Sequence, residues 1–205
     1  MNDEEVKRFL IDQLNVSHET FLKLESFVTF LMQWNKMHNL VSQGAVNELW
    51  YRHLLDSAQL ITFVSSTEQV VDFGSGAGFP GMILAILGRR VLLIERNKKK
   101  VAFLTEIARR LSLDVVIKNK SIEETKIENV DIITARGVAK IDLILAMTKH
   151  FASANTRYLL QKGKEWRGEL DAAAVKWNFI EKIDSSVTSE EGKLVTLTKV
   201  SKKYE

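Results

Sequence analysis

The chain of 205 residues contains no cysteine, a single proline and no apolar run of membrane-spanning length. Without cysteine, neither a disulfide framework nor a thiolate metal cluster can form. A membrane-spanning helix needs about 20 apolar residues. The first residues, Met-Asn-Asp-Glu-Glu, also lack the basic and apolar stretches of a signal peptide. We therefore expect a protein without a membrane segment and in the cytoplasm.

Histidine is scarce as well, and the four histidines lie too far apart for a metal-ligand pattern, so we expect no bound metal. Hydrophobic residues make up 45% of the chain and charged residues 27%, which allows a sizeable core. The net charge is only +3 but is unevenly distributed: residues 89–110 carry eight Lys or Arg against two Glu. This concentration suggests a polyanionic partner, although from charge alone an ordinary solvated helix face is the more common explanation of a charge run.

Hydrophobic periodicity divides the chain into two parts. Helical spacing covers residues 3–14, 18–38 and 46–63, and Ser17 is a favourable N-cap for the second helix. From residue 69 onward, short apolar runs alternate with amphipathic stretches. Strands are expected at 69–73, 91–95, 114–118, 130–135, 156–161, 178–187 and 193–200, and helices at 80–88, 97–111, 140–151 and 164–176.

This alternation predicts an α/β, Rossmann-like fold with a mostly parallel sheet covered on both faces. The last two strands are joined directly, without a helix, so they are expected as an antiparallel pair at one edge of the sheet. We expect a helical extension, residues 1–65, packed on a sheet domain, residues 66–205, and a monomer.

One motif carries most of the functional information. The apolar strand at 69–73 contains Asp72 and is followed by glycines at alternate positions, Gly74, Gly76 and Gly78. Pro80 then precedes an apolar helical stretch. Glycine permits positive φ and close approach of a ligand to the backbone, and a helix N-terminus offers unpaired N–H groups. The motif predicts a turn that binds an adenosine cofactor.

Two cofactor classes compete for this turn. Residues 76–81 match G-x-G-x-x-G, the dinucleotide fingerprint, and Glu95 lies 19 residues after Gly76, where it could bind a ribose. An acid two residues before the first of three alternating glycines is, however, more typical of S-adenosylmethionine enzymes. No hydride-handling residues can be named, so the motif favours S-adenosylmethionine. Glu95 serves in either case, because a carboxylate can accept both hydroxyls of a ribose diol.

Four motifs together resemble one known family, the bacterial 16S rRNA guanosine-N7 methyltransferases of the small subunit, historically called glucose-inhibited division protein B. The matching motifs are W-N-K-x-x-N-L at 34–40, R-H-x-x-D-S at 52–57, D-x-G-[ST]-G-x-G-[FL]-P-G at 72–81 and L-x-K-G at 160–163. The resemblance covers nearly the whole chain. It implies a class I S-adenosylmethionine-dependent methyltransferase fold. It also implies methyl transfer to N7 of a guanosine in the decoding-region loop of 16S rRNA, on free rRNA or in the small ribosomal subunit.

The resemblance also implies roles for individual residues. Gly74 and Phe79 should line the cofactor site, with Glu95 on the ribose and Ile122 and Glu123 on the adenine. The full set of expected cofactor-binding residues is Asp72, Gly74, Gly76, Gly78, Phe79, Glu95, Ile122, Glu123 and Arg136. Arg136 and Lys162 are the expected catalytic residues. The family's arginine before the adenine-binding pair is replaced by Ser121, with Lys120 beside it.

Guanine N7 already has a free lone pair, so no general base is required and catalysis should consist of positioning. An arginine fork on O6 and N7 would block the nucleophile. Arg136 should therefore hold O6, a phosphate or the cofactor carboxylate, and Lys162 should donate to O6 or a phosphate. A simple salt bridge at a strand end is the alternative for both residues.

The RNA-binding residues are expected to be Lys98, Lys99 and Lys100, together with Lys120 and His53. Lysines of this kind contact phosphates without reading sequence. His53 and Asp56 share one helix face and either reach the pocket or serve capping and packing. Trp34 and Asn35 are expected in packing and helix termination. Three other functions remain open: a methyltransferase for another base or a small molecule, an RNA-binding assembly factor with a vestigial cofactor site, and a nicotinamide oxidoreductase.

Overall fold

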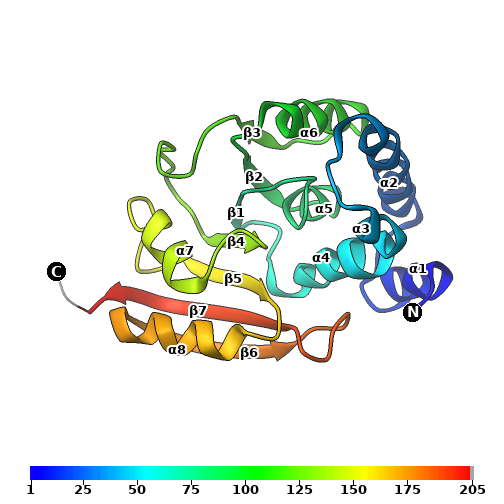
Figure 1. The fold of residues 1–205 in the computed structure, drawn as a ribbon. Helices are drawn as coiled ribbons and strands as arrows, with labels where there is room; N and C mark the ends of the chain where they lie inside the picture. Colours follow the sequence, from blue (N-terminus) through cyan, green and yellow to red (C-terminus); the bar gives the residue numbers. More distant parts are fainter. Residues whose placement is uncertain (204–205) are drawn as a thin grey trace.

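The computed structural model describes residues 1–203, apart from the side chains at positions 43 and 45; the last two residues of the predicted 66–205 domain lie outside it. The strands are β1 (Gln69–Phe73), β2 (Arg90–Ile94), β3 (Val116–Lys118), β4 (Ile132–Arg136), β5 (Arg157–Lys162), β6 (Trp177–Ser185) and β7 (Lys193–Lys202). Within the described residues they form one 7-stranded sheet in the order β3-β2-β1-β4-β5-β7-β6 (Figure 1).

The first five strands are parallel, and β7 pairs antiparallel with both β5 and β6. The predicted mixed sheet with an antiparallel C-terminal edge is therefore confirmed. Most observed strand bounds lie within two residues of the predicted bounds. The differences fall at the strand ends, where turn residues interrupt the apolar pattern.

The helices are α1 (Asp3–Asp12), α2 (His18–His38), α3 (Gln43–Asn47), α4 (Asp56–Ala58), α5 (Gly81–Ile86), α6 (Lys98–Arg110), α7 (Ile141–Thr148) and α8 (Trp166–Lys176), with a π-helical segment η1 (Leu49–Leu55) and a 3₁₀ segment η2 (Gln59–Phe63). They lie on opposite faces of the sheet, with α2, α5 and α6 together on one side and α7 and α8 on the other (Figure 1). Strand residues alternate between the two faces: Val70 belongs to the first core and Val71 to the second.

The N-terminal helices share a core with the sheet. Phe27 of α2 contacts Phe103 of α6, with ring centroids 6.0 Å apart, and Phe79 after β1, with centroids 5.6 Å apart. The predicted N-cap of α2 is confirmed, because the Ser17 hydroxyl accepts a hydrogen bond from the Thr20 N–H at 3.2 Å. These aromatic contacts with α6 pack the helical extension on the face of the sheet that α5 and α6 also cover.

The single helix predicted for 46–63 is wrong. This segment contains the end of α3, then η1, α4 and η2. In η1 the Asp56 N–H bonds to the His53 carbonyl and not to the Arg52 carbonyl, as a regular α-helix would require. The Arg52 carbonyl is engaged instead by a side chain from the sheet, Arg136. Hydrophobic spacing gives no sign of such a change of helical register, and Leu54 and Leu55 are both buried in the observed geometry.

No helix in residues 1–203 combines the length and the apolar character needed to cross a membrane.

Candidate functional site

The glycine turn follows β1 at the carboxyl edge of the sheet, where parallel α/β sheets bind ligands. Gly74, Gly76 and Gly78 have φ of +64°, +58° and +98°, a region that other residues rarely adopt. A Cβ on Gly74 would lie 2.7 Å from Val138 Cγ2, and one on Gly78 would lie 2.8 Å from Met82 Cβ. The turn therefore requires glycine for both its conformation and its packing, and its backbone remains accessible to a ligand at Gly74 and Gly76.

Asp72 lies fully buried beneath this turn. One carboxylate oxygen accepts the Gly81 N–H at 3.2 Å, at the beginning of α5, while the other oxygen has no hydrogen-bond partner within the described residues. Burial raises the pKa of Asp72 from its ordinary 3.8 to about 7. The Asp72 carboxyl group thus links the glycine turn to the beginning of α5. Because this carboxyl group is buried, its ionisation costs free energy.

A pH-dependent stability follows from the raised pKa of Asp72. The folded protein binds this proton more tightly than the unfolded chain, so the stabilisation is present at low pH and is lost as the pH rises from about 4 to 7. We expect Asp72→Asn to remove this loss. Between about pH 5 and pH 8 its unfolding free energy, measured in urea, should rise by roughly 2 to 3 kcal/mol relative to the unsubstituted chain.

The difference in unfolding free energy between the two proteins isolates the contribution of Asp72 from that of the other titrating groups. His53 has the opposite sign, since its pKa is lowered and protonation below about pH 6.5 destabilises the fold, but it is present in both proteins. An unchanged difference across the pH range would show that Asp72 is ionised in the folded state at all these pH values.

Glu95 follows β2, beside the turn, and is buried. Its Oε2 accepts the Gly76 N–H at 2.9 Å and its Oε1 accepts the Asn97 N–H at 2.7 Å. A carboxylate has about four lone-pair sites, so each oxygen keeps one for a ligand. The arrangement presents two fixed acceptors side by side over the glycine turn, which fits the two hydroxyls of a ribose.

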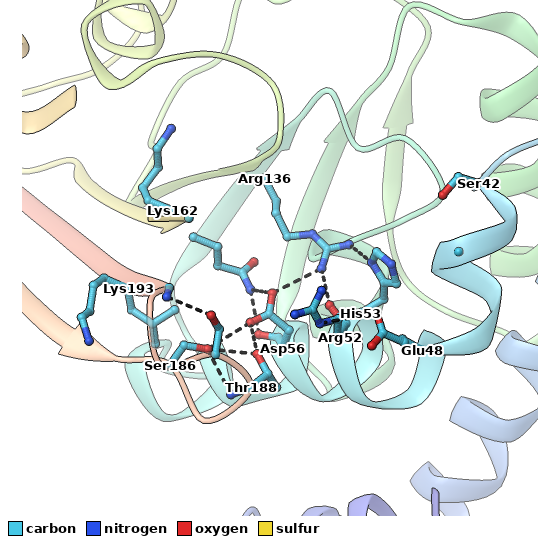
Figure 2. Close-up of a pocket in the computed structure, with 16 residues that line it drawn as sticks. Ser42, Glu48, Arg52, His53, Asp56, Arg136, Lys162, Ser186, Thr188 and Lys193 are labelled. Atoms are coloured by element: carbon cyan, nitrogen blue, oxygen red, sulfur yellow. Dashed lines mark hydrogen bonds and ion pairs between the residues drawn. The ribbon is translucent and has the colours of Figure 1, made fainter. Parts of the chain in front are cut away.

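Arg136, the last residue of β4, connects the turn to the N-terminal helices (Figure 2). Its guanidinium carbon lies 5.2 Å from the centre of the Phe79 ring in the turn. Nη1 donates to the Arg52 carbonyl at 3.1 Å and to Asp56 Oδ2 at 3.2 Å, and Nη2 contacts His53 Nδ1 at 2.7 Å. Burial lowers the pKa of Arg136, while the Asp56 carboxylate opposes that shift. The side chain is held from three sides.

The contact between Arg136 and His53 fixes the state of the imidazole. Burial, together with Arg136 and Arg52, lowers the pKa of His53 to about 4, so the ring is neutral near pH 7. A guanidinium can only donate, so His53 Nδ1 accepts and the proton lies on Nε2. The imidazole also packs on Phe79, with ring centroids 5.4 Å apart.

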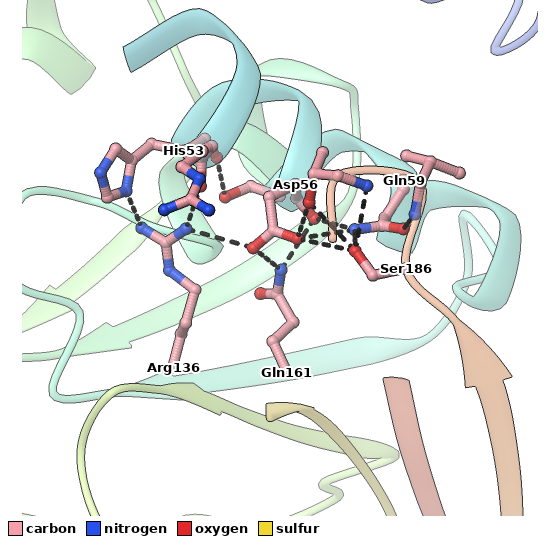
Figure 3. A network of polar contacts seen from close by, with 10 residues as sticks. His53, Asp56, Gln59, Arg136, Gln161 and Ser186 are labelled. Atoms are coloured by element: carbon pink, nitrogen blue, oxygen red, sulfur yellow. Dashed lines mark hydrogen bonds and ion pairs between the residues drawn. The ribbon is translucent and has the colours of Figure 1, made fainter. Parts of the chain in front are cut away.

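The carboxylate of Asp56 is the centre of a larger network (Figure 3). Besides Arg136, Oδ2 accepts a bond from the Gln161 amide at the end of β5. Oδ1 accepts bonds from Gln59 Nε2 at 2.8 Å, Thr188 Oγ1 at 2.7 Å and Ser186 Oγ at 3.3 Å. One carboxylate thus joins α4, two strand ends and the segment between β6 and β7. Removing it would leave several buried donors unpaired.

These groups line a pocket of about 530 Å³ beside the glycine turn (Figure 2). Its walls come from η1, the ends of β4 and β5, and the β6–β7 connection. The polar side chains that line it include Arg52, His53, Asp56, Arg136, Gln161, Lys162, Ser186, Thr188 and Lys193. The pocket is polar and donor-rich, which suits a polar, electron-rich ligand such as a nucleobase or a phosphate.

Lys162 lies on the wall of the pocket, but its ammonium is already engaged. It forms an ion pair with Glu169 at 2.6 Å and donates to the Ala139 carbonyl at 2.9 Å. One of its three N–H donors remains for a ligand. The structural alternative considered for Lys162, a salt bridge at a strand end, is therefore present, and its catalytic role stays a prediction.

The other predicted residues lie along the same edge of the sheet. Ile122 is buried, its carbonyl accepts the Thr125 N–H at 3.1 Å, and Glu123 is exposed. Lys98 and Lys99 are exposed at the beginning of α6, where Asn97 is the N-cap. Lys120 is exposed beyond β3. Lys100 differs from its neighbours, because its ammonium lies 4.0 Å from the Cβ position of Gly76 and so faces the turn.

Sequence reasoning left the role of Asp56 open and did not identify Gln161, Ser186 or Thr188. Gln161 occupies the variable position of L-x-K-G, and the two hydroxyl residues belong to no motif. Only R-H-x-x-D-S marked Asp56 in advance. Within the part of the chain that the structure describes, no group of three or more His, Asp or Glu side chains could hold a metal ion.

Comparison with known sequences gives a consistent result. Residues 21–198 match the family model described as rRNA small subunit methyltransferase G. Ribosomal RNA small subunit methyltransferase G of Rickettsia bellii (strain OSU 85-389) is 38% identical over 191 residues, which cover 92% of this chain and 98% of that protein. The protein of the same name from Orientia tsutsugamushi (strain Ikeda) is 36% identical over 189 residues, 91% of this chain and 94% of the relative.

Solved structures are similar in fold at low sequence identity. A point mutant of MtNAS in complex with S-adenosylmethionine superposes with a TM-score of 0.58 at 15% identity, covering 97% of this chain and 84% of that chain. M. jannaschii TYW2 in complex with AdoMet gives a TM-score of 0.57 at 17% identity, covering 79% and 78%. The fold is that of class I S-adenosylmethionine-dependent methyltransferases, as predicted.

Proposed function

The chain belongs to the rRNA small subunit methyltransferase G family, and from this premise we propose that it methylates N7 of a guanosine in the decoding-region loop of 16S rRNA. S-adenosylmethionine is the methyl donor, and the enzyme acts in the cytoplasm as a monomer. The observation that carries the proposal is the polar pocket beside the glycine turn, because a donor-rich pocket next to a turn of this kind suits a nucleobase.

The residues at the turn fit S-adenosylmethionine. Glu95 offers two acceptors for the ribose hydroxyls, and Gly76 leaves its backbone open where a side chain would project toward a ligand. Lys100, which faces the turn, suits the carboxylate of the methionine part. When bound, the cofactor supplies a methyl group activated by a sulfonium.

Arg136 is the residue that binds the acceptor nucleotide in this proposal. Its three contacts use three of its five N–H donors, so Nε–H and one Nη2–H have no partner within residues 1–203. These free donors suit guanine O6 or a phosphate and leave N7 unblocked. Since N7 already has a lone pair, the neutral His53 need not act as a base. It serves instead to hold Arg136 in place.

Asp56 is a positioning residue for Arg136. The guanidinium is oriented by Asp56 and His53 together, while Ser186 and Thr188 attach the wall of the pocket to the same carboxylate. A nucleotide that contacts Ser186 or Thr188 would therefore be linked, through the Asp56 carboxylate, to the orientation of Arg136. Preorganisation of this kind removes a reorganisation cost from the reaction.

A methyl-transfer assay tests the proposed function. The purified protein is incubated with labelled S-adenosylmethionine and small subunits from cells that lack the endogenous activity, and the 16S rRNA is mapped by mass spectrometry. We expect label at one N7-methylguanosine in the decoding-region loop. Label at another base or position would reject the substrate assignment, and no label despite measurable cofactor binding would indicate another substrate.

Lys98 and Lys99 are proposed to contact RNA phosphates. Their double substitution K98E/K99E leaves Lys100 in place at the glycine turn. We expect RNA binding to weaken about tenfold and its dependence on salt to become less steep, because each lost phosphate contact removes about 0.7 to 0.9 from the logarithmic slope. Binding measured over a salt series checks this, with R109E/R110E at the other end of α6 as the matched control. An unaltered slope would make this lysine pair an ordinary solvated surface.

A further inference from the structure

The W-N-K-x-x-N-L motif at the end of α2 contains one residue that the fold does not explain. Trp34 packs on Phe103, with ring centroids 5.7 Å apart. Asn35 Oδ1 accepts the Val41 N–H at 2.8 Å, which closes the turn after the helix. Asn39 ends α2 in the left-handed region, at φ +48°. These contacts confirm the expected packing and termination roles, but Lys36 takes part in none of them.

Lys36 projects from the last turn of α2 into solvent. Its side chain is exposed, and within residues 1–203 its ammonium has no hydrogen-bond or ion-pair partner. The side-chain amide of Asn39 is likewise exposed and without a partner in the same range. A helix C-terminus favours a cation, so Lys36 is stable there, but the dipole effect does not require a lysine at this position.

Lys36 borders a groove of about 730 Å³ that runs along the turn after α2. Its lining combines apolar residues, Met32, Leu40 and Val41, with polar residues, Lys36, Asn39 and Ser42. Met32 is 43% exposed. No acidic side chain lines the groove within the described residues. Apolar surface, amide groups and one unopposed cation therefore meet in one hollow.

This groove adjoins the pocket that holds Arg136. Ser42 lines both hollows, and Figure 2 shows it across the pocket from Lys162. An RNA chain whose guanosine occupies the pocket and whose next residue continues toward α3 would enter the groove. The chemistry of the groove suits such a nucleotide, because phosphate binds a lysine and an unstacked base contacts soft apolar side chains such as methionine.

We propose that the groove at the end of α2 binds a single-stranded nucleotide adjacent to the target guanosine, with Lys36 on its phosphate. The inference rests on the proposed function for the identity of the RNA. It assigns a binding role to the one motif residue that the fold leaves unused, and it extends the RNA-binding surface from the pocket to the helical extension.

Charge reversal at Lys36 tests the site by direct RNA binding. The probe is a hairpin RNA that carries the decoding-region loop, and its dissociation constant is measured by fluorescence anisotropy over a salt series. We expect K36E to bind about tenfold more weakly and to lose about 0.7 from the logarithmic salt slope. The matched control is K23E, which makes the same charge change on the same helix, outside the groove. K23E should bind within about twofold of the unsubstituted chain.

Three outcomes are informative. Unchanged binding by K36E overturns the proposal, and so does equal weakening by K36E and K23E, which would reflect net charge alone. If K36E weakens binding and K23E does not, the site is supported. This conclusion holds even if the methyl-transfer assay shows no N7 methylation, because that result would reject the proposed reaction and not the RNA contact. Crosslinking with 4-thiouridine placed next to the target guanosine should label residues between 32 and 46 in the supported case.

Discussion

Replacement of Arg136 by alanine is expected to lower the rate of methyl transfer by a factor of about 10² to 10³, the usual cost of removing a donor that orients a reacting group. The fold should survive, because Asp56 keeps four other hydrogen-bond donors, from Gln59, Gln161, Ser186 and Thr188. We expect the unfolding free energy to fall by about 1 to 3 kcal/mol. Single-turnover rates with labelled cofactor, together with thermal unfolding, check both values.

The same substitution tests whether Asp56 acts through Arg136. Asp56→Asn keeps the shape of the side chain but removes the charge that pairs with the guanidinium at 3.2 Å. We expect it to lower the rate about tenfold in the unsubstituted chain and to have little further effect when Arg136 is already alanine. Such non-additivity is what residues of one network show in a double-mutant cycle.

A matched control separates this effect from a general loss of stability. Glu68→Gln breaks the ion pair between Glu68 and Arg157, whose 2.8 Å contact is also partly buried but lies away from the pocket. It should cost similar stability and leave the methyl-transfer rate unchanged. Additive effects of the Asp56 and Arg136 substitutions would assign Asp56 to the fold alone, and an unchanged rate for Arg136→Ala would remove that residue from the site.

Replacement of Glu95 by glutamine is expected to weaken S-adenosylmethionine binding about 100-fold. The amide can accept only one of the two backbone N–H groups, from Gly76 and Asn97, that the carboxylate now accepts, and its NH₂ would face the other. It also loses a charged acceptor for the ribose, and hydrogen bonds to charged groups are worth about 1.5 to 3 kcal/mol. Titration calorimetry measures the affinity directly.

Glu106→Gln is the control for Glu95→Gln, because it makes the same chemical change at a residue outside the glycine turn. Glu106 lies on α6 and forms ion pairs with Arg109 and Arg110. It should leave cofactor affinity within about twofold, since exposed ion pairs contribute little. Full-strength binding by the Glu95 variant would contradict the ribose assignment. Lost binding with an unfolded chain would show that Glu95 acts by holding the turn.

The order of strands and helices and the cofactor turn could be predicted because both depend on local pattern. Short apolar runs and period-3.6 apolar spacing indicate which segments are buried strands and helices, and glycine tolerates the positive φ of Gly74, Gly76 and Gly78 best. The direct connection of β6 to β7 likewise predicted the antiparallel edge. The position of Glu95 beside the turn could be predicted from its distance along the chain, since a βαβ unit brings the ends of β1 and β2 together.

The composition of the pocket could not be predicted in this way. Asp56, Arg136, Gln161 and Thr188 meet only because β4, β5, the N-terminal helices and the last hairpin converge at one edge, across as many as 132 positions of sequence. The change of register in η1, which leaves the Arg52 carbonyl to Arg136, is invisible in the apolar pattern. The sequence determined where the glycine turn forms and which faces are buried. The tertiary structure decided which polar side chains share one carboxylate, because hydrogen bonds act over about 3 Å and depend on where distant elements are packed.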